Sequence, residues 1–287
     1  MAERGRDQRS ECAAGLPALD GRVLSRFCDR CYARDVMQPG ARYLRAVRLV
    51  RDSITDFSVY PFSIPSIRSL EELELDPKVT FLIGENGAGK STLIEAIAVL
   101  AGFNAEGGSK NFRFDTRRSE SALHQFMRPV RGHRRPSDGF FLRAESYFNV
   151  ATEIERLGGT IIDSYGGVSL HEQSHGESFI ALAEHRFRGK GLYILDEPEA
   201  ALSPQRQLTL LSIIHEHVEE LESQFIIATH SPILMAYPKA RIYRLGVDGI
   251  ERVAYENTEH YRITRDFLNS PERFFKTLFK RPNAGEE

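Results

Sequence analysis

The stretch GENGAGKST, residues 84–92, decides the fold of this chain. It follows a short apolar run, residues 78–83, with the composition of a buried strand. It leads into residues 90–103, where leucine and isoleucine recur at helical spacing. Glycines let the backbone N–H groups of such a loop surround an anion at a helix start. The pattern G-x-x-x-x-G-K-S/T between a strand and a helix predicts a phosphate-binding loop.

Each position in this loop has an expected role. Lys90 is expected to reach the β- and γ-phosphates of a nucleotide, and Ser91 to coordinate Mg²⁺. The alternative is a glycine-rich turn without a ligand. The residues expected to contact the nucleotide are Gly84, Glu85, Asn86, Gly87, Ala88, Gly89, Lys90, Ser91 and Thr92.

Two later apolar runs end in polar residues. LYILDEPEAALS, residues 192–203, reaches Asp196 and Glu197 where a strand should end, and parallel sheets bind ligands at that edge. Asp196 is expected to hold Mg²⁺ through water, and Glu197 to act as the general base for an attacking water. FIIATHSP, residues 225–232, places His230 where it can contact the γ-phosphate. The alternative is that these are structural residues at strand ends.

A second helix start, SHGES at residues 174–178, precedes the acidic strand. Free N–H groups and the positive end of the dipole make helix N-termini favourable for anions. Ser174 and Gly176 are therefore candidates for another phosphate contact. An ordinary helix cap is the alternative.

In this order the four motifs resemble those of ABC-class P-loop ATPases, in which a serine- and glycine-containing signature opens a helix before the acidic strand. His175 and Glu177 depart from the usual residues of that signature. DEPEAALSP and ATHSP are similar to the soluble branch of RecF-like, SMC-like and overcoming-lysogenization-type ATPases. Taken together along the chain, these motifs resemble those of compact bacterial ATPases of unassigned role. The resemblance covers residues 41–280.

The resemblance implies Mg²⁺-dependent hydrolysis of ATP by a homodimer, in which the signature of one subunit closes on the γ-phosphate held by the other. Members of this class also carry a Mg²⁺-sensing glutamine, for which Glu145 and Gln125 are the alternatives here. Tyr60 is the candidate for stacking on adenine. The catalytic residues that the resemblance implies are Glu197, His230 and Lys90.

Three functions fit these motifs. The first is a switch or mechanoenzyme that acts on nucleic acid or on a protein partner. The others are the ATP-binding subunit of a membrane transporter and a non-hydrolysing, ATP-dependent interaction module. The DEPE and THSP variants favour the first function. The interval between Lys90 and Ser174 is too short for SMC-like coiled-coil arms.

The alternation of strands and helices predicts an α/β P-loop NTPase fold, with a largely parallel sheet flanked by helices and a smaller antiparallel β portion. We expect the ABC-like ATPase domain to span residues 41–287. Residues 1–40 show no apolar period and predict a disordered extension, with Met37 as an alternative first residue. Half of a zinc site is the other interpretation of this segment, on Cys12, Cys28 and Cys31.

Composition argues against a disulfide-stabilised, a membrane-spanning or a secreted protein. The 287 residues carry a formal net charge of −2, and three cysteines argue against a disulfide scaffold. No apolar run approaches the roughly 20 residues of a membrane helix, and no secretory signal is present. These features predict a cytoplasmic protein without direct membrane insertion.

Two stretches suggest partners. RPVRGHRRP, residues 128–136, offers four arginines to nucleic-acid phosphates, with a solvated loop or a lid over the nucleotide as the alternatives. RDFLNSPERFFKTLF, residues 265–279, is rich in phenylalanine. It is expected to pack against the sheet, or else to dock a partner.

Overall fold

A computed structural model describes residues 43–110, 121–145 and 175–279 of the chain. These residues belong to one compact unit, residues 40–287. The residues named above that lie outside this part are Cys12, Cys28, Cys31, Met37 and Ser174. The extension over residues 1–40 and its boundary with the ATPase domain therefore stay predictions.

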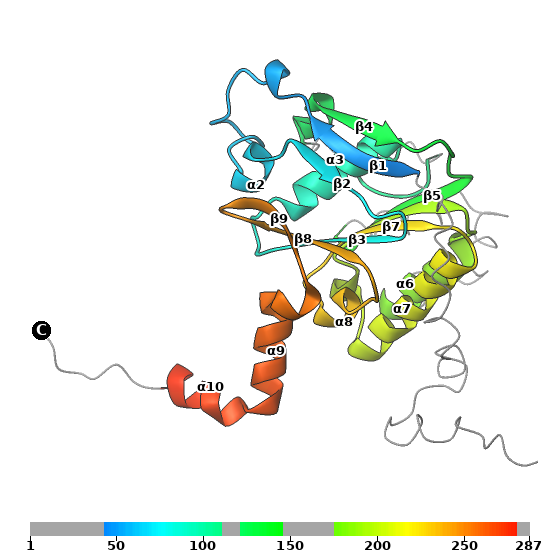
Figure 1. Cartoon of the computed structure of the whole chain (residues 1–287). Coiled ribbons are helices and arrows are strands. Elements are labelled where there is room, and N and C mark those ends of the chain that lie inside the picture. Colours follow the sequence, from blue (N-terminus) through cyan, green and yellow to red (C-terminus); the bar gives the residue numbers. More distant parts are fainter. Residues whose placement is uncertain (1–42, 111–120, 146–174, 280–287) are drawn as a thin grey trace, which may run out of the picture. The chain divides into compact units, whose positions relative to one another are not determined.

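A six-stranded, mostly parallel sheet forms the centre of this unit (Figure 1). Its strands, in order across the sheet, are β5 (Asp138–Arg143), β6 (Gly191–Asp196), β7 (Gln224–Ala228), β3 (Val79–Ile83), β8 (Arg241–Gly246) and β9 (Gly249–Val253). Among these six strands, β8 and β9 form the antiparallel pair, and the other neighbouring strands run parallel. Every residue of β3, β6 and β7 is buried. Their continuous apolar runs suit a parallel sheet that is covered on both faces, and the expected fold class is confirmed.

A smaller antiparallel sheet has the order β2 (Glu72–Glu74), β1 (Leu44–Leu49) and β4 (Met127–Arg131). Strand β4 corrects the interpretation of residues 128–136 as a loop, because the first part of that stretch pairs with β1. Met127 is fully buried at the start of β4 and anchors it in the core. Pro129 is tolerated because β4 lies at the edge of its sheet.

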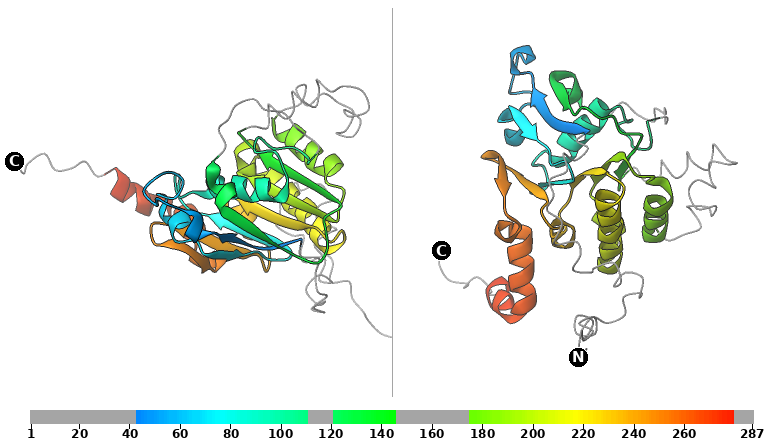
Figure 2. Two further views of the ribbon diagram at one scale, coloured as in Figure 1. Left: turned by 90° about the horizontal axis from the view of Figure 1, so that it is seen from above. Right: turned by 45° about the vertical axis from the view of Figure 1, so that its right-hand side comes forward.

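Helices cover the two faces of the large sheet (Figure 2). On one face α3 and the antiparallel sheet share one apolar core, and on the other α6 and α7 share a second. The longer helices are α3 (Lys90–Ala101), α6 (His175–Arg186), α7 (Pro204–Glu219), α9 (Glu259–Asn269) and α10 (Pro271–Leu278). The short helices are α2 (Pro65–Arg68), α8 (Pro232–Met235), and the 3-10 turns η3 (Arg51–Ser53), η4 (Ala122–Phe126), η5 (Pro198–Ala201) and η6 (Tyr255–Asn257). None of the helices within the described ranges combines the length and apolar character needed to cross a bilayer.

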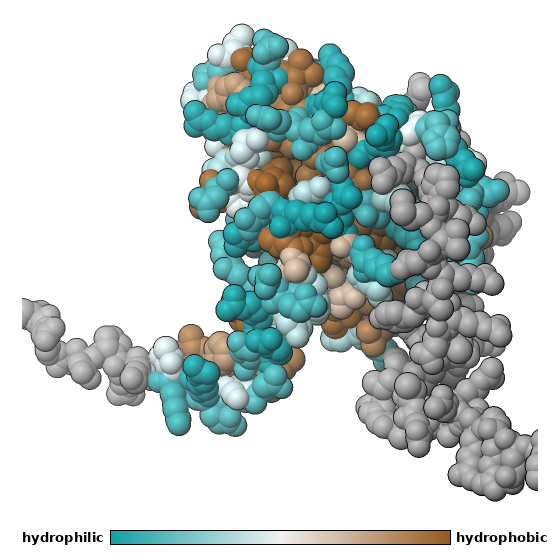
Figure 3. Space-filling view, viewed as in Figure 1, coloured by the Kyte–Doolittle hydropathy of each residue, from teal (hydrophilic) through white to brown (hydrophobic). Residues whose placement is uncertain are grey.

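The two C-terminal helices differ from expectation. Neither α9 nor α10 buries a residue, so the expected packing of residues 265–279 against the sheet is wrong for this part of the chain. Phe267 instead contacts the rings of Phe274 and Phe275, which lie one helix later. Apolar side chains of this segment are visible at the surface in Figure 3, and Leu268 is 72% exposed. The phenylalanines stabilise the α9–α10 corner rather than the core.

Gln224, at the start of β7, ties the two sheets together. Its side chain is fully buried. The amide oxygen accepts from the Leu44 N–H at 3.0 Å, and the amide nitrogen donates to the carbonyl oxygens of Leu44 and Asp76, both at 2.8 Å. Since Leu44 begins β1 and Asp76 precedes β3, the amide joins backbone groups of both sheets to β7.

Replacing this amide should destabilise the fold. We expect Gln224→Met to lower the free energy of unfolding by roughly 3 kcal/mol or more, because it leaves buried backbone groups without partners at about 1–3 kcal/mol each. Urea unfolding measures the change as a shift of midpoint at constant m-value. Gln205→Met, at an exposed position of α7, is the matched control and should stay within about 0.5 kcal/mol. Equal shifts in the two variants would contradict the role of Gln224.

Candidate nucleotide-binding site

The loop after β3 runs directly into α3, as the motif predicts. Gly84 has φ of +146°, and a Cβ there would lie 2.3 Å from the carbonyl oxygen of Leu245 on β8. Gly89 has φ of +93° and is the N-cap residue of α3. These two positions therefore require glycine for different reasons, a close strand approach and a left-handed backbone.

Lys90 turns back over the loop. Its Nζ donates to the carbonyl oxygens of Gly84 at 3.0 Å and Glu85 at 3.2 Å, and lies 3.9 Å from Glu197 Oε1. The side chain is only 4% exposed. Burial lowers the pKa of Lys90, while the carboxylates of Glu197 and Asp196 oppose that shift. The ammonium is thus held at the carboxyl edge of the sheet, where the motif predicts a phosphate.

Asp196 ends β6 beside the start of α3. Ser91 Oγ donates to Asp196 Oδ1 at 3.4 Å, and Arg143 Nε lies 3.4 Å from Asp196 Oδ2. Arg143 also donates to Glu95 Oε2 on α3 at 2.8 Å. Burial raises the pKa of Asp196 to about 7, although Arg143 opposes the shift. A dication beside this carboxylate would offset the cost of its burial.

The expected magnesium ligands fit the metal. Ser91 and Asp196 present two oxygen atoms to one place, and Mg²⁺ prefers oxygen ligands. Among the residues that the structure describes, no group of three or more His, Cys, Asp or Glu side chains could hold a metal ion. Mg²⁺ typically binds through one or two protein ligands, with phosphate and water completing its shell. Ser91 and Asp196 therefore suit a metal that arrives with a nucleotide.

Glu197 has a backbone conformation that is uncommon for a residue other than glycine. It is left-handed, with φ of 51° and ψ of 50°, immediately before Pro198 and η5. Its N–H donates to the Ala228 carbonyl oxygen on β7 at 2.9 Å, which holds it at the sheet edge. Non-glycine residues in this region cost about 1 kcal/mol or more and cluster at functional sites. The strained turn directs the carboxylate toward Lys90 and His230.

His230 follows β7 and faces the same carboxylate. The ring atom Nε2 of His230 lies 3.5 Å from Glu197 Oε1. The backbone N–H of His230 donates to Glu199 Oε1. Glu199 also accepts from Thr229 Oγ1 at 2.8 Å, so one half-buried carboxylate fixes the turn that carries His230. Burial and the nearby Lys90 lower the pKa of His230, so the ring favours its neutral form.

The start of α6 packs against η5. Gly176 is buried, and a Cβ there would lie 2.8 Å from the Ala201 carbonyl oxygen. Glu177 pairs with Arg206 on α7 at 2.9 Å. Packing alone therefore requires glycine at residue 176. The role of Gly176 in phosphate binding stays a prediction, as does that of Ser174.

The proposed Mg²⁺ sensors lie in different places. Glu145 comes two residues after Arg143, which contacts Asp196, and its side chain is 85% exposed. Gln125 lies in η4, which leads into the antiparallel sheet. Glu145 thus lies in the turn directly after β5, the strand whose last residue contacts Asp196, whereas Gln125 does not. Neither assignment is tested by this arrangement.

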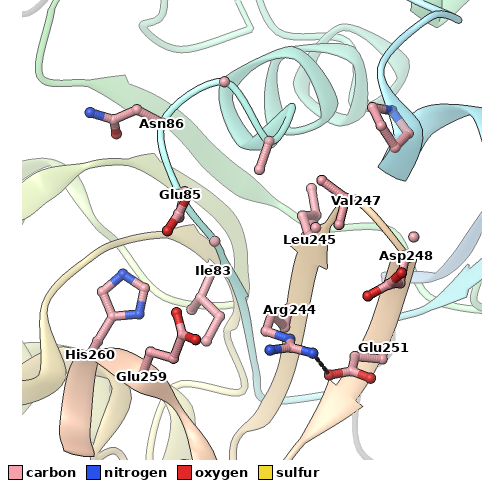
Figure 4. Close-up of a pocket in the computed structure, with 16 residues that line it drawn as sticks. Ile83, Glu85, Asn86, Arg244, Leu245, Val247, Asp248, Glu251, Glu259 and His260 are labelled. Carbon is pink, nitrogen blue, oxygen red and sulfur yellow. Dashed lines mark ion pairs between the residues drawn. The ribbon is translucent and has the colours of Figure 1, made fainter. Parts of the chain in front are cut away.

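A pocket of about 420 Å³ lies beside the phosphate-binding loop. It is lined by loop residues 83–88, by residues 244–249 of the β8–β9 hairpin, and by the first residues of α9 (Figure 4). His260 and Glu259 face the loop from one side, with the hairpin opposite. Tyr60 is not among the lining residues, and its hydroxyl lies 3.3 Å from Thr92 Oγ1. Its stacking on adenine stays a prediction.

Sequence reasoning missed three residues of this site. Glu199 carried a weak signal as the second glutamate of DEPE. Arg143 is the last residue of β5, but its ion pair with Asp196 could not be expected from the sequence. His260 had no signal, because it lies thirty residues after His230 in a segment without a motif, yet the two rings approach to 3.1 Å.

Two family models match the chain. One, described as an AAA domain, matches residues 62–157. The other, described as an AAA domain and proposed AbiEii toxin of a Type IV TA system, matches residues 119–236. Both matches include site motifs: the first covers the phosphate-binding loop, and the second covers the acidic strand and His230. Both models are described as AAA domains, and they support the predicted resemblance to P-loop ATPases.

Solved structures align at low identity. The SMC head domain from Thermotoga maritima is 17% identical, over 74% of this chain and 98% of that chain, with a TM-score of 0.40. The cbiO1 protein from Clostridium perfringens, part of the ABC transporter complex cbiONQ, is 16% identical over 83% and 100%, with a TM-score of 0.44. No curated protein matches the chain.

Asp196 should make stability depend on pH. Because burial raises its pKa from 3.8 to about 7, the folded protein holds a proton that the unfolded chain releases across this window, and stability falls as pH rises. Asp196→Asn should remove that loss, and the variant should be more stable than wild type at pH 8 by at most roughly 4 kcal/mol. Urea unfolding of metal-free protein at pH 5 and pH 8 measures the difference.

Asp138 provides a control of opposite sign. Burial alone would raise its pKa, but the Arg186 guanidinium at 2.7 Å and hydrogen bonds from Arg188 and Tyr193 lower it below its usual value. Its stabilisation is present above the unfolded pKa, so Asp138→Asn should destabilise the protein at pH 8. If the Asp196 and Asp138 variants shifted stability in the same direction at pH 8, the assigned burial costs would be wrong.

Proposed function

We propose that this chain binds ATP with Mg²⁺, dimerises in the ATP-bound state and hydrolyses the γ-phosphate. The observation that carries the proposal is the convergence of three polar residues at one sheet edge. Lys90 Nζ lies 3.9 Å and His230 Nε2 lies 3.5 Å from the same oxygen atom, Glu197 Oε1. These are the residue types that a phosphate-transfer site needs: a cation for the phosphates, a base for water and a polar contact for the γ-phosphate.

The chain's own residues divide the chemistry as follows. The loop N–H groups and Lys90 bind the phosphates and offset their charge. Glu197 orients the attacking water and accepts its proton, while His230 contacts the γ-phosphate from the neighbouring strand. Mg²⁺, held by Ser91 and Asp196, supplies charge stabilisation at the phosphate oxygens when bound.

Dimerisation is proposed from the resemblance and from symmetry. In a twofold dimer the α6 start of each subunit faces the phosphate loop of the other, so that each site is shared. The contact of α6 with η5 supports this arrangement, because η5 directly follows Glu197 and links the helix start to the catalytic turn.

The proposed role is a switch or mechanoenzyme acting on nucleic acid or a protein partner. The arginines of residues 128–136 give limited support to a nucleic-acid interface. Arg128 and Arg131 donate to carbonyl oxygens of their own chain, and Arg134 lies 3.4 Å from Glu222. These contacts position part of the basic stretch within the fold.

Replacing the proposed base should trap the bound state. Glu197→Gln keeps the size of the side chain but removes the proton acceptor, so ATP hydrolysis should fall on the order of 10²–10⁴-fold while ATP binding persists. Phosphate release measures turnover, and light scattering with ATP should reveal a dimer. Glu184→Gln, at an exposed position of α6, is the matched control and should keep wild-type activity. Wild-type turnover by Glu197→Gln would exclude Glu197 as the base.

Shared sites can be tested by mixing two inactive variants. Lys90→Ala removes the phosphate contact, and Ser174→Arg should crowd the facing γ-phosphate. A mixed dimer has one site with both changes and one site with neither. Random exchange makes about half of the dimers mixed, so activity should return to roughly a quarter of wild type if the sites are independent.

Mixing wild type with Lys90→Ala calibrates this experiment. Those mixed dimers also hold one intact site, and their activity shows what one site contributes when the other is disabled. The two kinds of mixed dimer should therefore have equal activity. Full activity of Ser174→Arg alone would contradict the shared-site arrangement and leave SHGES as a helix cap.

A further inference from the structure

A second histidine contacts the site from a segment that carries no motif. His260 lies in the first turn of α9, and its Nε2 is 3.1 Å from Nδ1 of His230. The ring centroids are 5.3 Å apart. This distance between nitrogens permits one N–H···N hydrogen bond, with a proton on one nitrogen and a lone pair on the other.

The other ring nitrogen of His230 has a different environment. Nε2 is buried, makes no hydrogen bond within the described residues and lies 3.5 Å from Glu197 Oε1. A bare lone pair there would face the lone pairs of a carboxylate, whereas an N–H would face them favourably. The geometry therefore favours the Nε2–H tautomer of His230, which also provides the donor that a phosphate oxygen requires.

The tautomer of His230 then determines that of His260. With its proton on Nε2, His230 has a lone pair at Nδ1. If Nε2 of His260 were also unprotonated, the two lone pairs would repel each other. Nε2 of His260 must instead carry the proton and donate. This arrangement leaves Nδ1 of His260 without a proton, and that atom is buried and makes no hydrogen bond within the same residues.

The start of α9 is anchored although the helix buries none of its residues. Thr258, its N-cap, is 1% exposed, and its hydroxyl accepts from the Tyr261 N–H. Just before it, the Tyr255 hydroxyl donates to the Pro232 carbonyl oxygen at 3.0 Å. Since Pro232 begins α8, two residues after His230, one local network fixes both histidines relative to each other.

We propose that His260 is a positioning residue, which donates to Nδ1 of His230 and so directs an Nε2–H toward the γ-phosphate site. This inference rests on the proposed ATPase function. It also assigns a function to the first turn of α9, whose remaining turns lie exposed beyond the sheet (Figure 1). Hydrogen-bond partners that orient metal-ligating histidines typically contribute about 10- to 100-fold, and we expect an effect of similar size here.

Two substitutions separate donation from packing. His260→Leu fills the space without a donor, and we expect its kcat to fall about tenfold or more. KM for ATP should stay within about twofold, because the phosphate loop is unchanged. His260→Gln carries an amide N–H near the position of Nε2 and should recover most of the lost kcat. Arg262→Leu, at an exposed position of the same helix, is the matched control and should behave as wild type.

Equal loss in the leucine and glutamine variants would overturn the proposal, as would wild-type kcat in His260→Leu. A second measurement needs no catalysis. In ¹⁵N-labelled, nucleotide-free wild type, nuclear magnetic resonance should show His230 protonated at Nε2 and bare at Nδ1, and His260 protonated at Nε2. His230→Ala and His260→Gln assign the two rings. A proton on Nδ1 of His230 would refute the proposed donation.

These readouts distinguish the two levels of inference. Wild-type protein without ATP hydrolysis would remove the proposed function, while the tautomers of the two rings would still be measured. An active wild type with the reverse tautomers would remove only the role of His260.

Discussion

The burial of unlike charges at one edge of the parallel sheet is the constraint on which this structure depends. Strands β3, β6 and β7 are buried along their whole length, so their carboxyl ends lie between two apolar layers. Lys90 and Asp196 meet there with little access to water, and the half-buried Glu197 lies beside Lys90. Buried charges are stable only when they are paired or hydrogen-bonded, and the surrounding residues meet that requirement.

The charges of Lys90 and Asp196 are only partly offset by their neighbours, which suits a charged phosphate ligand. Lys90 has carbonyl oxygens as its nearest partners, and the pKa of Asp196 stays raised despite Arg143. Glu197 adds a left-handed backbone to the same few residues. A nucleotide with Mg²⁺ would bring opposite charges to both the ammonium and the carboxylate. The site thus lowers the stability of the free protein while it prepares electrostatic contacts for binding, a balance common at functional sites.

The site also extends beyond the strands that carry its motifs. Arg143 reaches Asp196 from β5, and His260 reaches His230 from α9. Both contacts act on residues that were predicted from the motifs, and both orient rather than replace them. The exposed C-terminal helices are therefore connected to the edge that carries the candidate site through the first turn of α9.

The sequence by itself determined the phosphate loop, the acidic strand end and the position of His230, because each is a short contiguous pattern. Uninterrupted apolar runs also determined the parallel strands. The tertiary structure alone decided the edge strand β4, the amide of Gln224 between the sheets, and the contacts of Arg143 and His260. Those features join residues far apart in the chain. A single polar side chain forms no periodic pattern from which its partner could be predicted. Its role is set by which buried group it meets, and only the packed fold brings the two together.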